Sequence, residues 1–342
     1  MTCFKLIYIN YEQNLRFIRA VVREELKMPG AKKGSLVFLF AISLTLACLS
    51  LLPARANSAE APPALKSLTP EEKLWLYNLR QERWEANSRQ ILQRISSFRG
   101  ETGLVVKDLQ TGWTFLHNDE ARFPAASLIK IPIMVASFKA VEDGRLDLQE
   151  KYVLRRPDRV GGSGLLRRMR NGRTFTYGEL IDYMVTHSDN IATNVIIKRL
   201  GLDYIRNVLK ELDLKDTVLN RLMMDFRARE EGLENYTSAR EMTWLLEMIY
   251  HRRCLNAWIS DKCLDVLKRQ RINDRLPRFL PREAMVAHKT GQEREVCHDA
   301  GIVFSPHGDY IITVLVRTWT GPLTTKTFIA RLSSYFYQVF KT

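Results

Sequence analysis

The sequence has few of the residues that build metal sites and disulfide frameworks. Its 342 residues include five cysteines and six histidines, and no group of them has the spacing of a metal site. It has no repeat of fixed period and no glycine-rich phosphate loop of the form G-x-x-x-x-G-K. These absences argue against a zinc domain and a phosphate-loop nucleotide site, so we expect no metal and no cofactor.

Acidic residues are also the minority. There are 38 Asp and Glu against 52 Lys and Arg, which gives a net charge of +14. A basic surface suits several kinds of anionic partner and does not by itself indicate nucleic acid. No RNA-binding aromatic motif, zinc-finger spacing or single dense Lys/Arg run is present, which argues against a nucleic-acid partner. We therefore expect a monomer that acts on a small molecule or a peptide.

The longest apolar run lies near the N-terminus, at residues 35–52. Two lysines precede it, and the small-residue pattern Ala54-Arg55-Ala56 follows it, which is the arrangement of a secretory signal peptide. We expect the signal to direct export to the periplasm or the extracellular space and to be cleaved after Ala56. The run of about 18 residues is also long enough to stay as a membrane anchor. Met28 would begin a signal of conventional length, so we expect residues 1–27 to reflect a start codon assigned too early.

The rest of the chain is predicted to be one domain, residues 69–342, after a linker rich in Ala, Pro and Ser at residues 57–68. Thr69-Pro70-Glu71-Glu72 has the form of a helix start with a capping box, and the helix should run to about Phe98. A hairpin is predicted around residues 110–112, followed by a mostly helical stretch from about 176 to 270.

The last third of the chain turns to strand patterns and closes with an amphipathic helix. Strands at both ends with helices between them predict an α/β fold of the α+β type. In it, one antiparallel sheet is built from the N- and C-terminal segments, and a helical block is inserted between them. Three cysteines remain after the predicted signal: Cys254, Cys263 and Cys297. Cys254 and Cys263 flank a short connection and either pair or stay reduced and buried.

Three short motifs occur in order along this domain: Ser127-Leu-Ile-Lys130, Ser188-Asp189-Asn190 and Lys289-Thr290-Gly291. A lone S-x-x-K is expected about once by chance in a chain of this length, whereas each of the other two is expected on the order of 0.1 times or less. A serine and a lysine three residues apart lie on one face of a helix. This set is that of the penicillin-recognising serine enzymes.

From about residue 84 to the C-terminus the sequence resembles the class A β-lactamase family and its penicillin-binding relatives. The stretches DLQTG, ARFPAAS and SDNIATNVIIKRLG add to the likeness. The resemblance implies a class A β-lactamase-like fold with Ser127 as nucleophile and Lys130 as the base that activates it. It implies that Ser188 passes a proton to the leaving nitrogen and that Asn190 binds the amide side chain of the substrate.

The resemblance also assigns roles to the third motif. Lys289 and Thr290 would bind the substrate carboxylate from an edge strand, and Gly291 would let the acyl group lie against the backbone. The amides of Ser127 and Gln292 would form the oxyanion hole. The run at 161–164, GGSG, is interpreted as a flexible loop near the site entrance.

One part of the family pattern is absent. A β-lactamase needs a carboxylate that activates water against the acyl-serine, and the usual Glu-x-x-Leu-Asn does not occur. Within residues 219–239, Asp225 falls closest to the expected place and is our candidate. Glu230, Glu231 and Glu234 are rivals, and a loop aspartate that only caps a turn is the alternative.

The arginine that the family often places on the strand after Lys-Thr-Gly is also missing. Arg294 and His298 are the candidates to replace it, and neither fits the family pattern well. His298 next to Asp299 also allows a Ser-His-Asp arrangement. The sequence therefore predicts an exported active-site-serine hydrolase that opens β-lactam rings through an acyl-enzyme. The alternatives are a D-alanyl-D-alanine peptidase and a non-catalytic binder of cell-wall peptide.

Overall fold

The computed structural model describes residues 68–341. The predicted signal segment, residues 1–56, and the linker up to residue 67 lie outside the described residues. Among the described helices, none is both long and apolar enough to cross a membrane.

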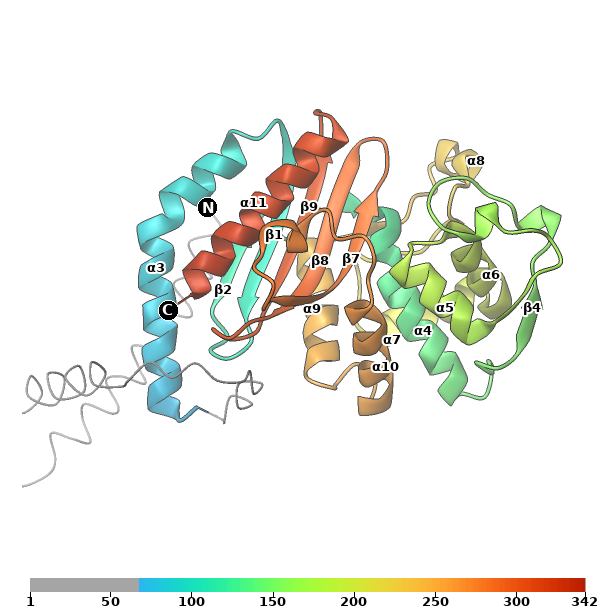
Figure 1. Ribbon diagram of the computed structural model, residues 1–342, viewed down its shortest axis with the longest axis horizontal. Helices are drawn as coiled ribbons and strands as arrows, with labels where there is room; N and C mark the ends of the chain where they lie inside the picture. The colour runs from blue at the N-terminus through green and yellow to red at the C-terminus, as the bar shows by residue number, and fades with distance from the viewer. Residues whose placement is uncertain (1–67, 342) are drawn as a thin grey trace, which may run out of the picture. The chain divides into compact units, whose positions relative to one another are not determined.

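The centre of the fold is a five-stranded antiparallel sheet in the order β2-β1-β9-β8-β7 (Figure 1). The strands are β1 (Gly100–Asp108), β2 (Thr114–His117), β7 (Met285–Gln292), β8 (Val296–Phe304) and β9 (Tyr310–Thr318). Strand β1 pairs with β9 along its whole length, from Gly100 opposite Thr318 to Asp108 opposite Tyr310. This pairing confirms that the N- and C-terminal segments share one sheet. Both faces of β8 and β9 are buried, which explains why these strands read as continuous apolar runs.

Two long helices cover one face of the sheet, α3 (Pro70–Ser96) and α11 (Pro322–Phe340) (Figure 1). As predicted, α3 begins with a capping box between Thr69 and Glu72. The core on this side contains Trp113, Phe336 and Phe340. Arg80 of α3 donates hydrogen bonds to the carbonyl oxygens of the last residues of α11, which stabilises the end of that helix.

The helical block packs on the other side of the sheet and holds most of the core. It contains α4 (Lys130–Glu142), α5 (Tyr177–Thr186), α6 (Asn190–Leu200), α7 (Leu202–Glu211), α8 (Phe226–Glu230), α9 (Ala239–Tyr250) and α10 (Ala257–Lys268). Helix α4 is apolar nearly all round and lies at the centre of the block, as such a helix must. The 3₁₀ turn η1 (Ala126–Ile129) leads directly into it.

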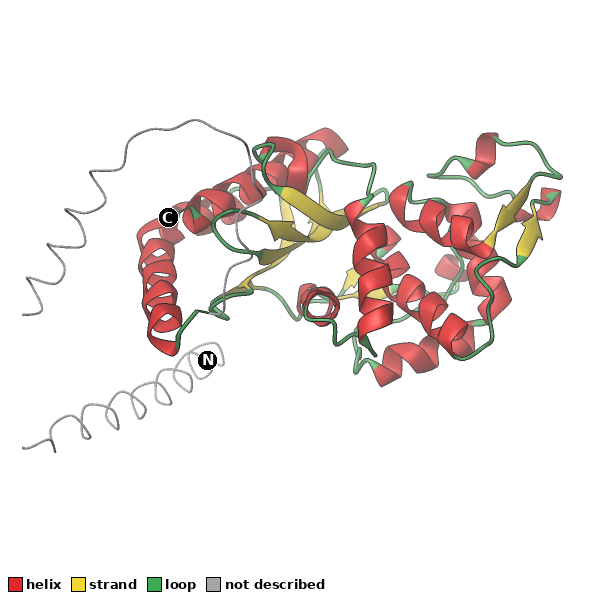
Figure 2. Cartoon of the chain, turned by 60° about the horizontal axis from the view of Figure 1, so that its bottom comes forward, coloured by secondary structure: helices red, strands yellow, loops and turns green. Residues whose placement is uncertain are grey.

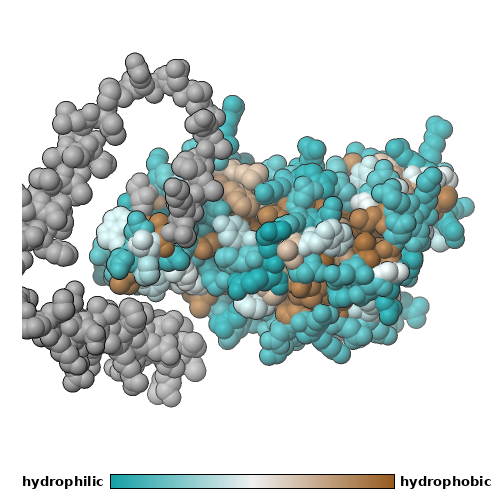
Figure 3. Space-filling model, turned by 90° about the horizontal axis from the view of Figure 1, so that it is seen from below, coloured by the Kyte–Doolittle hydropathy of each residue, from teal (hydrophilic) through white to brown (hydrophobic). Residues whose placement is uncertain are grey.

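Two small ribbons complete this part of the molecule. β3 (Phe123–Pro124) pairs with β6 (Tyr236–Thr237), and β4 (Lys151–Val153) pairs with β5 (Thr174–Thr176). Figure 2 shows the β4–β5 ribbon at the end of the helical block that faces away from the five-stranded sheet. On the face seen in Figure 3, hydrophilic side chains predominate and apolar ones gather in a few patches.

The three described cysteines, Cys254, Cys263 and Cys297, are free and buried. Burial raises the pKa of the Cys254 thiol to about 12. Of the two alternatives for Cys254 and Cys263, the structure has the reduced one.

Candidate active site

Ser127 lies in η1, at the junction between the helical block and the edge strand β7. The preceding residue, Ala126, has φ = 44°, a left-handed conformation that costs energy for a residue with a side chain and is often found at functional sites. The Ser127 side chain is largely buried, and its hydroxyl has no hydrogen-bond partner among residues 68–341.

Lys130 opens α4 and is completely buried. Its ammonium group donates to the backbone oxygen of Ser188 at 2.7 Å and to the side-chain oxygen of Asn190 at 2.8 Å. The hydroxyl of Ser188 is a third partner at 3.2 Å. In the described part of the chain no carboxylate forms an ion pair with it. Burial therefore lowers the pKa of Lys130 to about 7, against a partial opposing effect of the Asp189 and Glu293 charges.

The second motif is a strained turn before α6. Ser188 has φ = 54°, and Asp189 caps α6 by accepting from the Ala192 amide at 3.0 Å. The other oxygen of Asp189 accepts from the Leu166 amide at 2.8 Å. Asp189 therefore holds the turn together, as the types of residue in this motif favour.

The third motif brings a second buried lysine to the same hydroxyl. Lys289 of β7 donates to Ser188 Oγ at 3.0 Å and to the backbone oxygen of Thr290 at 2.7 Å. Its pKa lies well below the usual value, first because of burial and then because of the positive charges of Lys130 and Arg275. The three motifs, of which the first and the last lie more than 150 residues apart in sequence, thus meet at the hydroxyl of Ser188.

The end of β7 lies beside η1. Strand β7 is an edge of the sheet, and the amide of Glu293 bonds inward to the oxygen of Val296 on the hairpin. Because successive amides of a strand point to opposite sides, the amide of Gln292 points away from β8, to the open edge. A Cβ at Gly291 would approach the carbonyl oxygen of Ala125 to 3.3 Å, so β7 and the lead into Ser127 are in close contact.

Arg275 is a site residue that the sequence analysis missed. It is buried, donates to the side-chain oxygen of Gln292 at 2.7 Å and contacts the sulfur of Cys297 at 3.2 Å. Its charge is one cause of the lowered Lys289 pKa. A single arginine in the stretch QRINDRLPR carries no sequence signal that would set it apart from its neighbours.

The interpretation of His298 as a catalytic or carboxylate-binding residue is wrong. Its Nδ1 accepts from the amide of Val316 at 3.1 Å, and its Nε2 donates to the oxygen of Pro124 at 2.8 Å. Burial lowers its pKa to about 4, so it is a neutral structural link. Asp299 instead pairs with His288 at 2.8 Å, so no Ser-His-Asp arrangement forms. No contact of the Arg294 side chain with the three motifs is seen within residues 68–341.

Asp225 does not join the cluster. Its carboxylate accepts from the amide of Ala228 at 3.1 Å and caps the short helix α8. It forms no hydrogen bond or ion pair with Ser127, Lys130 or Ser188, so its geometry fits the alternative of a turn cap. The rivals fare no better: Glu231 pairs with Arg227 on an exposed surface, and Glu230 is exposed.

Two methionines occupy the part of this loop nearest to α6. The backbone of Met223 is held by the Asn194 side chain through two hydrogen bonds, of 2.8 and 3.0 Å. Asn194 lies one helical turn after Asn190, on the same face of α6. Met224 lies against Gly162, close to the Asn190 amide. Within the described residues, the loop therefore brings the Met224 thioether, and no carboxylate of its own, close to Asn190, which bonds to Lys130.

Charged side chains fasten this loop to β7. Arg221 is buried and pairs with Glu234 at 2.7 Å, which closes the base of the loop. Arg229 of α8 pairs with Glu234 at 3.1 Å and with Glu293 at 3.2 Å. Glu293 directly follows Gln292, and it also approaches Arg221 to 3.4 Å. These four side chains join the loop to the end of the edge strand.

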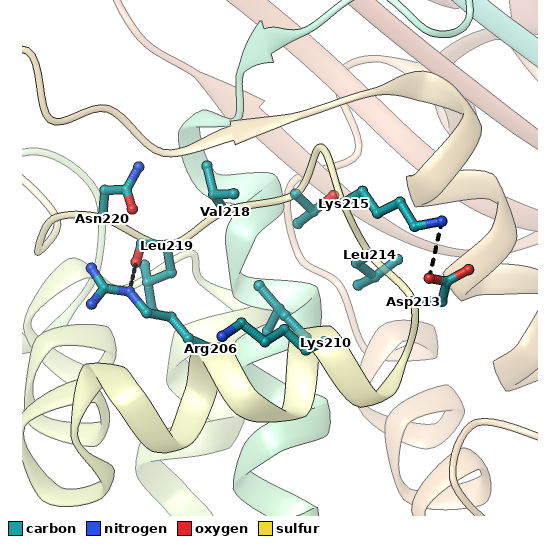
Figure 4. A pocket seen from close by; sticks show the side chains of 10 residues that line it. Arg206, Lys210, Asp213, Leu214, Lys215, Val218, Leu219 and Asn220 are labelled. Carbon is teal, nitrogen blue, oxygen red and sulfur yellow. Dashed lines mark hydrogen bonds and ion pairs between the residues drawn. The ribbon is translucent and has the colours of Figure 1, made fainter.

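Away from the three motifs, a concave surface lies between α7 and residues 213–220 (Figure 4). Arg206 donates to the oxygen of Leu219 there, and Lys215 pairs with Asp213 at 3.3 Å. None of the residues that line this surface belongs to the three motifs.

Comparison with known proteins assigns the chain to a family. The sequence profile of the β-lactamase enzyme family matches residues 86–340. The chain belongs to this family. It is a serine hydrolase of the class A β-lactamase type, with the class A fold.

Individual relatives are distant. A β-lactamase of Pseudomonas aeruginosa, VEB-1, is 26% identical over 222 residues, which cover 58% of this chain and 71% of the relative. A β-lactamase from Sphaerobacter thermophilus is 27% identical in structure-based comparison, with a TM-score of 0.70, and covers 75% of this chain and 97% of its own. PBP-A has a higher identity, 33%, with a TM-score of 0.68 and coverage of 77% and 96%. A mutant of PBP-A is described as an acyl-enzyme complex with penicillin G.

Proposed function

We propose that the chain opens β-lactam rings by transferring their acyl group to Ser127. Lys130, with its lowered pKa, takes the proton of the Ser127 hydroxyl as the oxygen attacks the lactam carbonyl. The C–N bond then breaks, and Ser188 passes a proton to the leaving nitrogen. The proton returns to Ser188 through Lys130, whose nitrogen lies 3.2 Å from the hydroxyl.

The remaining residues would bind the substrate. The amides of Ser127 and Gln292 stabilise the negative charge on the carbonyl oxygen. Lys289 and Thr290 would bind the substrate carboxylate, with the buried Arg275 behind Gln292, and the negative charge of that carboxylate would raise the pKa of Lys289. Asn190 bonds to the amide side chain of the substrate.

The observation that carries this proposal is the position of Ser188 Oγ between the Lys130 and Lys289 nitrogens, at 3.2 and 3.0 Å. Stopped-flow mixing with a chromogenic β-lactam tests it. A burst of ring opening equal to the enzyme concentration, with an adduct on the peptide that contains Ser127, is expected. Absence of both the burst and the adduct would refute it and would favour a non-catalytic binder.

The residues near the acyl group favour a second candidate, a D-alanyl-D-alanine peptidase. Both reactions share the acylation step and differ in how fast water releases the acyl group. The Met223 backbone is bonded to Asn194, the Met224 side chain lies close to Asn190, and no carboxylate of the described loop bonds to the three motifs. The likeness to PBP-A at 33% identity supports the same candidate. Steady turnover after the burst would indicate a β-lactamase, and a burst alone would indicate the peptidase.

The cellular location also remains a proposal. We propose export, based on the lysines, the apolar run at residues 35–52 and the A-x-A pattern that follows. N-terminal sequencing of secreted material should show that the mature chain begins near Asn57. Recovery of peptides from residues 35–50 in the membrane fraction would show instead that the segment is kept as an anchor.

A further inference from the structure

The segment between β4 and β5 is unusually rich in arginine. Residues 155–173 contain seven arginines and a single acidic residue, Asp158, for a net charge of +6. The arginines are dispersed among apolar and glycine residues, so they do not form one continuous run. We define the arginine surface as Arg155, Arg156, Arg167, Arg168, Arg170 and Arg173.

This segment has an ordered framework. The β4–β5 ribbon fixes its two ends, and the buried Asp158 accepts from the Tyr152 hydroxyl and the Arg155 amide, both at 2.8 Å. The seventh arginine, Arg159, is a strut that donates to the backbone oxygens of Leu166 and Met169 at 2.7 and 2.6 Å. Internal bonds thus use one guanidinium group and the one carboxylate.

The six members of the arginine surface are exposed. Within residues 68–341 none of them forms an ion pair with a carboxylate, although Arg173 lies over the ring of Phe175. Six unpaired cations within 19 residues of chain add positive charges that repel one another, which is a cost that folding does not require. An anionic partner would remove that cost.

The same segment forms a wall of the active site. The hydroxyl of Ser163 donates to the backbone oxygen of Ser188 at 2.6 Å, and the amide of Asn190 donates to the oxygen of Ser163 at 3.2 Å. The side chain of Asn190 also donates to the oxygen of Gly161 at 3.2 Å. A ligand on the arginine surface would therefore bind the same segment whose tip, Gly161 to Ser163, contacts the second motif.

We propose that the arginine surface docks a polyanionic cell-wall polymer, namely peptidoglycan strands whose peptides carry free carboxylates. Guanidinium groups bind carboxylates through paired hydrogen bonds. Six of them on one segment, whose tip contacts the second motif, would hold the polymer while one of its peptides enters the site. The proposal rests on the proposed function, because the polymer would carry the peptide substrate of the second candidate.

Nucleic acid fits the same surface less well. Single-stranded nucleic acids bind grooves that combine positive charge with exposed aromatic rings for base stacking. Residues 155–173 contain no aromatic residue, and on the flanking strands the ring of Phe175 is buried while Tyr152 is only partly exposed and bonded to Asp158. The exposed large apolar side chains here are those of Val153 and Leu165, which are aliphatic.

The test compares the full domain with two variants of equal charge loss. The first replaces five members of the surface by glutamine: Arg155, Arg156, Arg167, Arg168 and Arg170. The matched control replaces five exposed cations elsewhere by glutamine: Lys73, Arg89, Arg99, Arg282 and Arg331. Binding to soluble peptidoglycan fragments is measured between about 50 and 200 mM salt, with fragments whose carboxylates have been converted to amides as a second probe.

The first variant should lose about tenfold or more in affinity at 100 mM salt and should show a weaker salt dependence, whereas the control should bind like the wild type. Amidated fragments should bind the wild type as weakly as the first variant binds the native ones. Equal losses in both variants, or full binding of amidated fragments, would overturn the proposal. Tighter binding of DNA or polyphosphate at equal charge concentration would also overturn it.

Labelling by a small β-lactam separates this result from the proposed function. The five arginines lie outside the reacting groups, so both variants should form the Ser127 adduct at the wild-type rate, which also shows that they are folded. If the wild type forms no adduct but still binds the fragments through the arginine surface, the proposed function fails and the docking surface stands.

Discussion

The two sides of the site, which we call the acylation wall and the loop wall, use their polar groups in different ways. On one wall, Lys130 and Lys289 are buried and bonded to Ser188, next to the serine that we propose as nucleophile. On the other wall, the loop 219–239 directs its charged groups to one another and to β7, and methionines lie beside the site. The comparison indicates a site that is complete for acylation and has no evident base for the release of the acyl group.

The largest expected effect is that of Ser127→Ala. The variant should form no penicilloyl adduct, because the attacking oxygen is gone. Intact-protein mass spectrometry checks this. Ser137→Ala in α4, the helix that follows Ser127, is a matched control, since the Ser137 hydroxyl only bonds to the oxygen of Ile133. An adduct of the same mass on Ser127→Ala would show that the acylation wall has been assigned to the wrong residue.

Lys130→Met should slow acylation by about 10²–10⁴-fold, the usual contribution of a general base. In the wild type, the acylation rate should rise with pH through about 7 and then level off, because only the deprotonated amine can take the serine proton. Stopped-flow rates between pH 5 and 9 measure both. A flat profile over this range would contradict the role of Lys130 as the base.

Arg221→Met tests the ion pairs that hold the loop 219–239. This change leaves the buried Glu234 with the half-exposed Arg229 as its one remaining ion-pair partner among the described residues. It should lower the free energy of unfolding by about 3–5 kcal/mol. Glu293→Gln removes only the outer part of the network and should cost about 0.2–1 kcal/mol. Urea unfolding compares them, and equal losses would show that the base of the loop is not what holds it.

The smallest effect is expected for Asp225→Asn. Because Asp225 caps α8, its replacement should lower the free energy of unfolding by at most about 2 kcal/mol. The lifetime of the acyl-enzyme should not change. Glu230→Gln, on the same helix and exposed, is the control. Accumulation of acyl-enzyme in Asp225→Asn alone would restore Asp225 as the residue that activates water and would remove the difference between the two walls.

The acylation wall could be predicted because its residues lie in short motifs whose internal spacing is local. Ser127 and Lys130 share one helical turn, and Lys289 to Gly291 are consecutive. The sharing of one sheet by the N- and C-terminal segments also followed from the order of strands and helices. Arg275 could not be predicted, since it joins the site only through contacts with Gln292 and Cys297 across the folded sheet.

The loop wall was harder to predict for a physical reason. Which residue of a loop faces the site depends on how the loop is anchored, and here the anchors are Asn194 on Met223 and Asn235 on the base of the loop. Both are contacts between separate segments. The cap formed by Asp225, by contrast, is local, and that alternative was visible in the sequence.

The most direct test of the difference between the walls is the lifetime of the acyl-enzyme in the wild type and in Met223→Glu. The backbone of residue 223 is bonded to Asn194, one helical turn from Asn190, so we expect a glutamate there to bring a carboxylate to the part of α6 that carries Asn190, the partner of Lys130. Time-resolved mass spectrometry after mixing with penicillin G should show similar acylation in both and release about 10²–10⁴-fold faster in Met223→Glu. Rapid release by the wild type, or no gain from the added carboxylate, would contradict the account.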